Sequence, residues 1–175
     1  MTGEAGRPLL EALAAKKGAI LDAWLARTLA SYPEHTSRFL SREKDPFKNP
    51  VGRTLAEAFS ALFDRFVEGA DGALLSPLLD PIVRIRAVQD FSAGQAVAFV
   101  FLLKPVVRET LKPERQHDPS GEDLAAVEAR IDEMALCAFD LFMQCREQLH
   151  QIKANEAKRR LFVLERIREK RAEAG

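Results

Sequence analysis

The chain has 175 residues, a mass of 19.5 kDa and equal numbers (26) of basic and acidic side chains, so it has the size of one domain and no net charge. A net charge of zero argues against a dedicated nucleic-acid binder, and the longest uncharged apolar run, residues 91–103, is shorter than the roughly 20 residues of a membrane span. The N-terminus has no basic head followed by an apolar segment, so we expect a cytoplasmic protein with no nucleic-acid partner and no membrane contact.

Apolar residues recur at helical spacing along nearly the whole sequence, and no segment shows the alternation of a β-strand. The first helical segment has apolar residues on one broad face between residues 10 and 29, with a break or bend expected at Lys17-Gly18. A short helix over residues 34–40 and a polar connection over residues 41–50 follow. The sequence therefore predicts an all-α fold.

The next two predicted helices begin with a capping residue and a proline. The dipeptide Asn49-Pro50 reads as an N-cap followed by proline in the first helical position, and Gly69 closes this helix. The dipeptide Asp80-Pro81 repeats the pattern and predicts a helix that ends near Gln89. Both helices would begin where the sequence supplies a side chain that can bond the first free backbone N–H groups.

A third helix start has capping-box spacing. Ser92 and Gln95 are three residues apart, so we expect a helix from about Ala93. This segment is apolar on all sides, which predicts the most buried element of the fold. Pro105 should kink it, because proline has no backbone N–H to donate.

The last segment predicts one very long helix. After the proline-containing loop at residues 112–119, Ser120 would cap a pattern that has no proline or glycine from residue 122 to residue 174. This is one helix of up to about 50 residues, or two helices in line, against a usual length of about 11–12. We therefore expect a globular part over residues 1–120 and a long helix over residues 121–175, whose first half packs on the globule and whose end projects toward a partner.

The apolar seam of this helix continues beyond the part that the globule can cover. Exposed apolar patches of this kind usually mark an interface, and a two-fold dimer is the commonest way to bury one. The expected surface for a dimer or a partner protein consists of Leu149, Ile152, Leu161, Phe162, Leu164 and Ile167.

Charge is divided along the same helix. Residues 114–133 carry two basic and seven acidic side chains, whereas residues 152–171 carry eight basic and three acidic ones. This polarity complements the helix dipole, and the basic end could instead dock on an acidic partner or touch nucleic acid weakly. It favours antiparallel pairing of two copies, because parallel pairing sets two basic ends side by side.

Arg84, Arg86 and Asp90 are the candidates for a polar site in the interior. Arg86 and Asp90 have the i, i+4 spacing of an ion pair, whereas Arg84 points the other way, among Val88 and Phe91. An arginine on an apolar face is unfavourable unless it is paired or reaches solvent. The cluster is therefore a candidate contact for an anion or signal ligand, or else a structural ion pair or an arginine that extends to the surface.

The residues needed for other chemistry are few. Cys137 and Cys145 are eight positions apart, roughly 12 Å along one helix, which is too far for a disulfide, and no further ligands suit a metal site. His35, His117 and His150 lie among polar neighbours and not on the apolar face that a haem ligand needs. We expect no catalytic residue, no cofactor and no metal.

Three strings resemble a known family. They are WLARTLASYPEHTSRFL at residues 24–40, NPVG at residues 49–52 and IVRIRAVQDFSAGQAVAFVFLLK at residues 82–104. Together they are similar to the N-terminal domain of RsbR- and RsbRD-type proteins, the co-antagonists of stressosome signalling. The likeness extends over approximately residues 8–150, which is most of the chain.

The resemblance implies a globin-like helical bundle without haem, a homodimer in which parallel pairing is preferred, and a long C-terminal helix that leads to an output domain. This sequence ends at Gly175, where such an output domain would begin, so we expect a stand-alone input module. The expected function is a non-catalytic sensory domain of stress-type signalling that dimerises and binds a partner protein. The alternatives are a small-ligand sensor with a pocket between the Phe-rich helices and an assembly subunit that docks through its C-terminal helix.

Overall fold

The protein is helical throughout the part that its computed structural model describes, which is residues 7–42, 45, 47–89, 91–112 and 121–173. No strand occurs in these ranges, so the predicted all-α class is confirmed. The expectation of a globin-like arrangement is compatible with this fold and remains a prediction.

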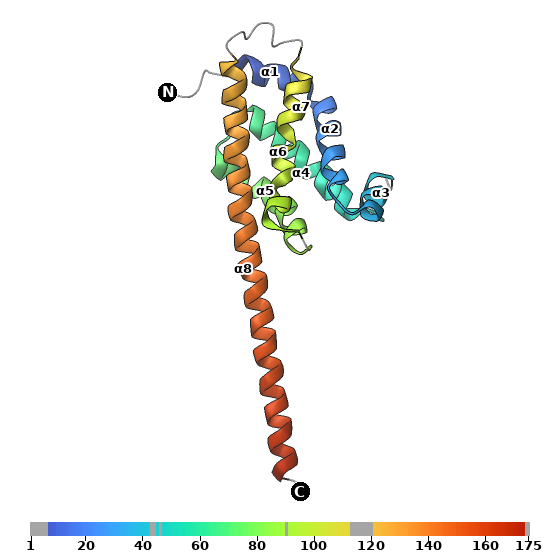
Figure 1. The fold of residues 1–175 in the computed structure, drawn as a ribbon, viewed down its shortest axis with the longest axis vertical. Helices are drawn as coiled ribbons and strands as arrows, with labels where there is room; N and C mark the ends of the chain where they lie inside the picture. The colour runs from blue at the N-terminus through green and yellow to red at the C-terminus, as the bar shows by residue number, and fades with distance from the viewer. Residues whose placement is uncertain (1–6, 43–44, 46, 90, 113–120, 174–175) are drawn as a thin grey trace.

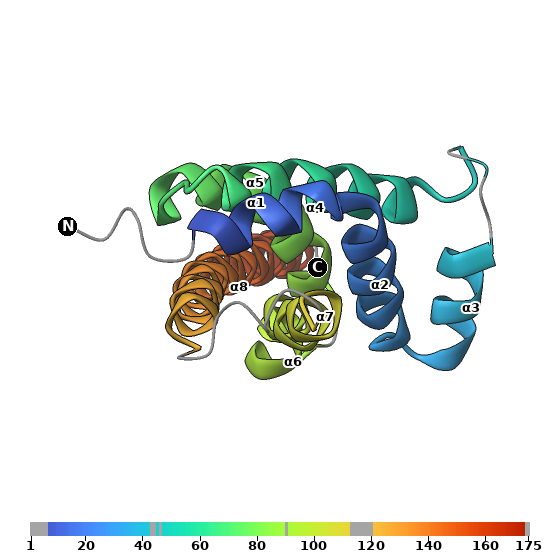
Figure 2. The ribbon, with the colours of Figure 1, turned by 90° about the horizontal axis from the view of Figure 1, so that it is seen from above.

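The helices form a globule at one end of a long rod. They are α1 (Arg7–Ala15), α2 (Lys17–Ala30), α3 (Glu34–Arg42), α4 (Pro50–Val67), α5 (Gly72–Ala87), α6 (Ala93–Phe101), α7 (Leu103–Thr110) and α8 (Glu122–Glu173). Helices α1 to α7 gather around the first part of α8, and the far end of α8 stands well away from them (Figure 1). Seen along the rod, α3 lies at the edge of the globule farthest from α8 (Figure 2).

Two of the predicted helix boundaries in the first half are confirmed. The break near Lys17 is present, since α1 ends at Ala15 and α2 begins at Lys17. Asn49 caps α4: its Oδ1 accepts a hydrogen bond from the Gly52 N–H at 2.8 Å, and its Nδ2 donates to the Leu40 carbonyl at 2.9 Å. This buried amide therefore joins the end of α3 to the start of α4.

The predicted start of a helix at Asp80-Pro81 is wrong. Helix α5 begins at Gly72 after an Asp71 cap and continues through Pro77 and Pro81 to Ala87. The two prolines remove backbone donors inside the helix, yet the apolar face continues without interruption on both sides of them. Burial of this face, which consists of Leu75, Leu79, Ile82 and Val83, outweighs the local signal.

The capping box of Ser92 and Gln95 is confirmed, and the segment after it is two helices. The break between α6 and α7 falls at Leu102, three residues before Pro105, which cannot donate to the Phe101 carbonyl. Most apolar side chains of this segment are buried, but Phe101 is 45% exposed. The segment expected to be the most buried element of the fold is therefore open to solvent at Phe101.

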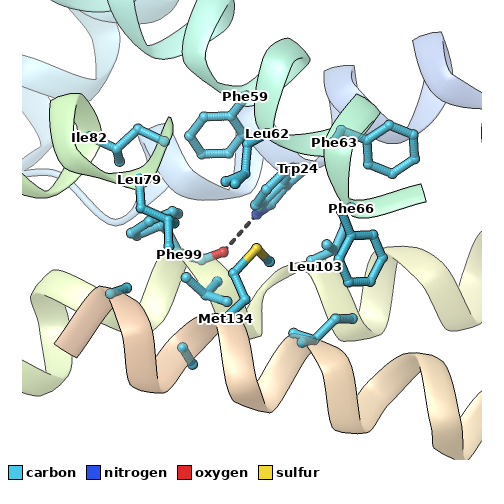
Figure 3. Packing of buried hydrophobic residues seen from close by; sticks show 14 of the residues in the cluster. Trp24, Phe59, Leu62, Phe63, Phe66, Leu79, Ile82, Phe99, Leu103 and Met134 are labelled. Atoms are coloured by element: carbon cyan, nitrogen blue, oxygen red, sulfur yellow. Dashed lines mark hydrogen bonds between the residues drawn. The ribbon is translucent and has the colours of Figure 1, made fainter. Parts of the chain in front are cut away.

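The core is organised around a tryptophan. Trp24 of α2 is fully buried, its ring centre lies 4.2 Å from that of Phe59 in α4, and its Nε1 donates to the Phe99 carbonyl of α6 at 2.6 Å. Figure 3 shows this bond, with Phe59 of α4 on one side of Trp24 and Met134 of α8 on the other. The indole ring of α2 therefore contacts α4 and α6, which are distant from it in the sequence.

Helix α8 is a single helix of 52 residues, which corresponds to about 78 Å. It begins at Glu122, directly after Gly121, whose φ of 71° lies in the left-handed region that glycine adopts easily. The expected cap, Ser120, lies outside the described residues. The first part of α8 packs on α5 and α6, whereas every residue from His150 to Arg168 is exposed.

A search of the described residues for a helix that is both long enough and apolar enough to cross a membrane finds none.

We predict that Trp24→Phe lowers the free energy of unfolding by about 2–3 kcal/mol, because it removes a buried hydrogen bond and part of a fully packed ring. Leu74→Ala is the control, since Leu74 is 62% exposed and should cost less than about 0.5 kcal/mol. Urea melts of both variants measure the difference. Equal losses would contradict the central position of Trp24.

Candidate functional site

Arg86 is the one charged side chain among the described residues that is fully buried. Its guanidinium carbon lies 4.4 Å from the centre of the Phe91 ring, 5.0 Å from that of Tyr32 and 5.8 Å from that of Phe99. Its Nη2 donates to the Ser31 hydroxyl and to the Gln95 carbonyl, each at 3.0 Å. Arg86 therefore connects α5 to the end of α2 and to the start of α6.

No carboxylate of the described residues pairs with Arg86. Burial lowers the pKa of this guanidinium. Its Nε and Nη1 atoms are buried and have no hydrogen-bond acceptor. Asp90, which the sequence suggested as its partner, lies outside the described residues.

Arg84 does not belong to the interior. Its side chain is 57% exposed, and its Nε donates to Asp80 of the same helix at 2.6 Å. The face that appeared apolar in the sequence is open to solvent, since Val88 on that face is 68% exposed. Arg84 therefore forms an ordinary surface ion pair, and the sequence argument chose the wrong one of the two arginines as the unusual residue.

A pocket of about 490 Å³ opens beside Arg86. It is lined by Ser31, Tyr32, Pro33, Thr36, Gln89, Phe91 and Gln95. The Tyr32 hydroxyl and Gln89 Oε1 are buried without a hydrogen-bond partner. Burial raises the pKa of Tyr32, and the nearby guanidinium partly opposes this shift.

The sequence placed Gln89 on the same side of the helix as Arg86 but gave no reason to include Tyr32. Tyr32 is the single tyrosine of the chain and lies directly before Pro33, where α2 has ended. Only the folded chain brings this ring to Arg86, because the two residues are far apart in sequence.

The residues expected to form a dimer or partner surface lie along α8. Leu149 is half-buried and shares a shallow pocket with Arg84 and Val88, where α8 leaves the globule. The others are exposed to the extent of 46–62%: Ile152, Leu161, Phe162, Leu164 and Ile167. The structure therefore places these five side chains in solvent on the single chain.

The sequence argument missed a second apolar group on α8, alongside the globule. Leu136, Phe139 and Met143 are 67%, 41% and 49% exposed. Phe101 of α6 is also exposed. Lys104, 5.9 Å from its ring, pairs with Asp132 of α8, one turn before Leu136. The seven-residue spacing of Leu136 and Met143 could have revealed this group from the sequence alone.

Leu136, Met143, His150, Ala157 and Leu164 follow one another at intervals of seven residues, so they fall along one side of a long helix that is apolar except at His150. We call this side the α8 stripe and include Phe139 and Leu161, which flank it. The stripe runs from the globule into the exposed part of α8. Its length, about 28 residues, corresponds to roughly 42 Å.

The remaining candidate histidines and cysteines are not gathered into one site in the described residues. His35 and His150 are exposed, and His117 lies outside the described residues. Cys145 is buried and Cys137 half-buried; both are free thiols whose pKa is raised by burial. No group of three or more His, Cys, Asp or Glu residues that could hold a metal ion occurs in the described ranges.

Comparison with known proteins gives one family. A family model described as "RsbT co-antagonist protein rsbRD N-terminal domain" matches residues 18–157. No curated protein and no solved structure matches the chain. The matched range includes the Arg86 pocket and most of the α8 stripe.

We predict that Arg86→Ala lowers the free energy of unfolding by about 2–4 kcal/mol, because it leaves a cavity among three rings and removes the donor to Ser31 and Gln95. Arg84→Ala, two positions away, should leave the urea midpoint within the scatter of replicate melts, since exposed ion pairs contribute little. Similar losses in both variants would show that Arg84 has an interior role after all.

Proposed function

The chain belongs to the family of RsbT co-antagonist protein rsbRD N-terminal domains, and from this premise we propose that it is a non-catalytic input domain of stress-type signalling that dimerises and binds a partner protein in the cytoplasm. The observation that supports this proposal most is the α8 stripe. It gives the domain an apolar surface on the same helix that leads away from the globule.

A second copy of this chain is the occupant that the stripe fits best. In a parallel pair of helices, residues at one heptad position face their own counterparts. Leu136, Met143, Ala157 and Leu164 would then each meet the same residue of the second copy, as would His150 in the middle of the stripe, and Phe139 and Leu161 would flank these contacts. The stripe is thereby covered along its whole length by one symmetric interface.

Charge and geometry favour different orientations of the pair. Antiparallel pairing would set the acidic start of α8 against the basic end of the second copy, whereas parallel pairing places two basic ends together at a cost in repulsion. Parallel pairing, which we propose, presents both ends on the same side of the dimer. Two adjacent basic ends form a surface that suits an acidic partner protein.

The exposed end of α8 is the part proposed to contact that partner. Phe162 is 59% exposed and lies on the side of α8 away from the stripe, and Arg166 lies 5.6 Å from its ring. This apolar and basic combination remains accessible after two stripes have paired. A chain truncated after Ile152 should therefore keep the globule and lose the partner.

We predict that the purified chain is a dimer at micromolar concentration, with a mass of about twice 19.5 kDa by light scattering. Leu136→Asp combined with Met143→Asp should give a monomer, because two charged groups per copy would face each other in an apolar interface. Phe39→Asp is the matched control: Phe39 is 50% exposed, on α3 at the far edge of the globule, and its variant should stay dimeric. A parent chain with a mass near 19.5 kDa would contradict the dimer.

The orientation of the pair is tested by Ala157→Cys. In a parallel pair the two new thiols are adjacent, so mild oxidation should give a disulfide-linked dimer on a non-reducing gel. In an antiparallel pair centred on the stripe, residue 157 meets residue 143 of the second copy and the single variant does not cross-link. The parent chain, which retains Cys137 and Cys145, measures the background.

A further inference from the structure

The unsatisfied polar atoms of this protein gather at one place. In the ranges that the structure describes, four buried side-chain nitrogen or oxygen atoms have no hydrogen-bond partner: Tyr32 Oη, Arg86 Nε, Arg86 Nη1 and Gln89 Oε1. Nearly all such groups are satisfied in folded proteins, because leaving one unpaired is unfavourable. All four belong to residues in or beside the 490 Å³ pocket.

Two of these four atoms, Nε and Nη1, belong to Arg86, which also carries a buried positive charge. The Tyr32 and Phe91 rings lie close to the guanidinium and stabilise its charge. They are weaker acceptors than oxygen atoms and leave the hydrogen bonds of Nε and Nη1 unmade. An oxygen acceptor that carries a negative charge would supply both the hydrogen bonds and a counter-charge that no described residue provides.

The pocket has the size and lining of a small-molecule site. Its volume lies within the usual range of about 300–1,000 Å³ for such sites. Pro33 and Phe91 give it an apolar part, whereas Ser31, Thr36 and Gln95 give it a polar part. Among the described residues no charged side chain lines it, so the Arg86 behind its wall supplies the positive charge there. A single positive charge matches a carboxylate better than a doubly charged phosphate.

We propose that this pocket binds a small organic carboxylate whose charge is paired with Arg86. The Tyr32 hydroxyl donates a second hydrogen bond to the carboxylate. The amide oxygen of Gln89 accepts a hydrogen bond from a hydroxyl or amino group of the ligand. The ligand is therefore a hydroxy- or amino-carboxylate, and its apolar part lies against Pro33 and Phe91.

Access to Arg86 depends on Phe91. The Phe91 ring packs 4.4 Å from the guanidinium carbon and meets Tyr32 edge-on at 5.3 Å between ring centres. Phe91 lies in the connection between α5 and α6 and not within a helix. Its ring can therefore turn away from Arg86 without breaking helical hydrogen bonds, which opens the guanidinium to the pocket.

The site is also connected to α8. Arg86 lies on α5 and donates to Gln95 of α6, and these two helices pack on the first part of α8. A carboxylate that draws the guanidinium toward the pocket acts on both helices. Naming this ligand a signal rests on the proposed input function, whereas the binding itself does not.

The direct test is calorimetric titration of the full chain with named probes. 3-Phenyllactate and lactate are the carboxylates, their amides are the uncharged matches, and inorganic phosphate is the alternative anion. We expect saturable binding of 3-phenyllactate with a Kd of about 1 mM or tighter, and no binding of its amide or of phosphate. Binding of neither carboxylate, or equal binding of 3-phenyllactate and its amide, would overturn the proposal.

Variants assign the binding to this pocket. Arg86→Gln should weaken the binding of 3-phenyllactate by about tenfold or more, whereas the matched control Arg84→Gln should leave it unchanged. Tyr32→Phe should weaken binding about two- to tenfold while the free protein loses little thermal stability, since its hydroxyl makes no hydrogen bond of normal geometry within the protein. This variant decides the matter if Arg86→Gln does not fold.

An internal counter-ion is the competing explanation. If Asp90 neutralises Arg86, as its spacing in the sequence suggested, Asp90→Asn would create or strengthen carboxylate binding. The proposal expects Asp90→Asn to bind 3-phenyllactate as the parent does. Binding of 3-phenyllactate that occurs only in Asp90→Asn overturns the proposal. The binding test is independent of the dimer test, because neither Arg86 nor Tyr32 lies on the α8 stripe.

Discussion

The globule covers only the first part of the 52-residue helix α8, so the second part is exposed to solvent in the single chain. One side of α8 is buried by α5 and α6, where Ile131, Met134 and Ala138 enter the core. The opposite side has Leu136 and Met143 in solvent next to a well-packed domain. Long helices in water gain most of their stability from packing, and we therefore propose that a second surface covers the exposed half of α8.

A second group without a full set of bonding partners lies inside the globule. Arg86 has a buried charge whose pairing within the described residues is limited to neutral groups and aromatic faces. It touches the end of α2, the start of α6 and its own helix α5, so its position affects the elements that pack on α8. An input domain needs a place that responds to a signal and an element that carries the response away. We propose the Arg86 pocket and α8 for these two roles.

Local chemistry made part of this structure predictable. Asn49 and the pair Ser92 and Gln95 define helix starts through bonds within four residues, so the sequence alone was sufficient for them. The start of α5 was mispredicted because the apolar face that holds Pro81 inside the helix is stabilised by tertiary packing. The roles of Arg84 and Arg86 were exchanged for the same reason: which side of α5 faces the core depends on helices that lie far away in the sequence. Tyr32 could not be placed beside Arg86 without the fold.

The claim that a second copy covers the α8 stripe is tested most directly by hydrogen exchange at two protein concentrations, one well above and one well below the dissociation constant of the dimer. We expect the backbone amides of residues 150–168 to be protected at the high concentration and to exchange rapidly on dilution, while the core of α4, residues 55–66, stays equally protected in both. Exchange in residues 150–168 that does not depend on concentration would contradict the account, because the stripe would then have no second copy to cover it.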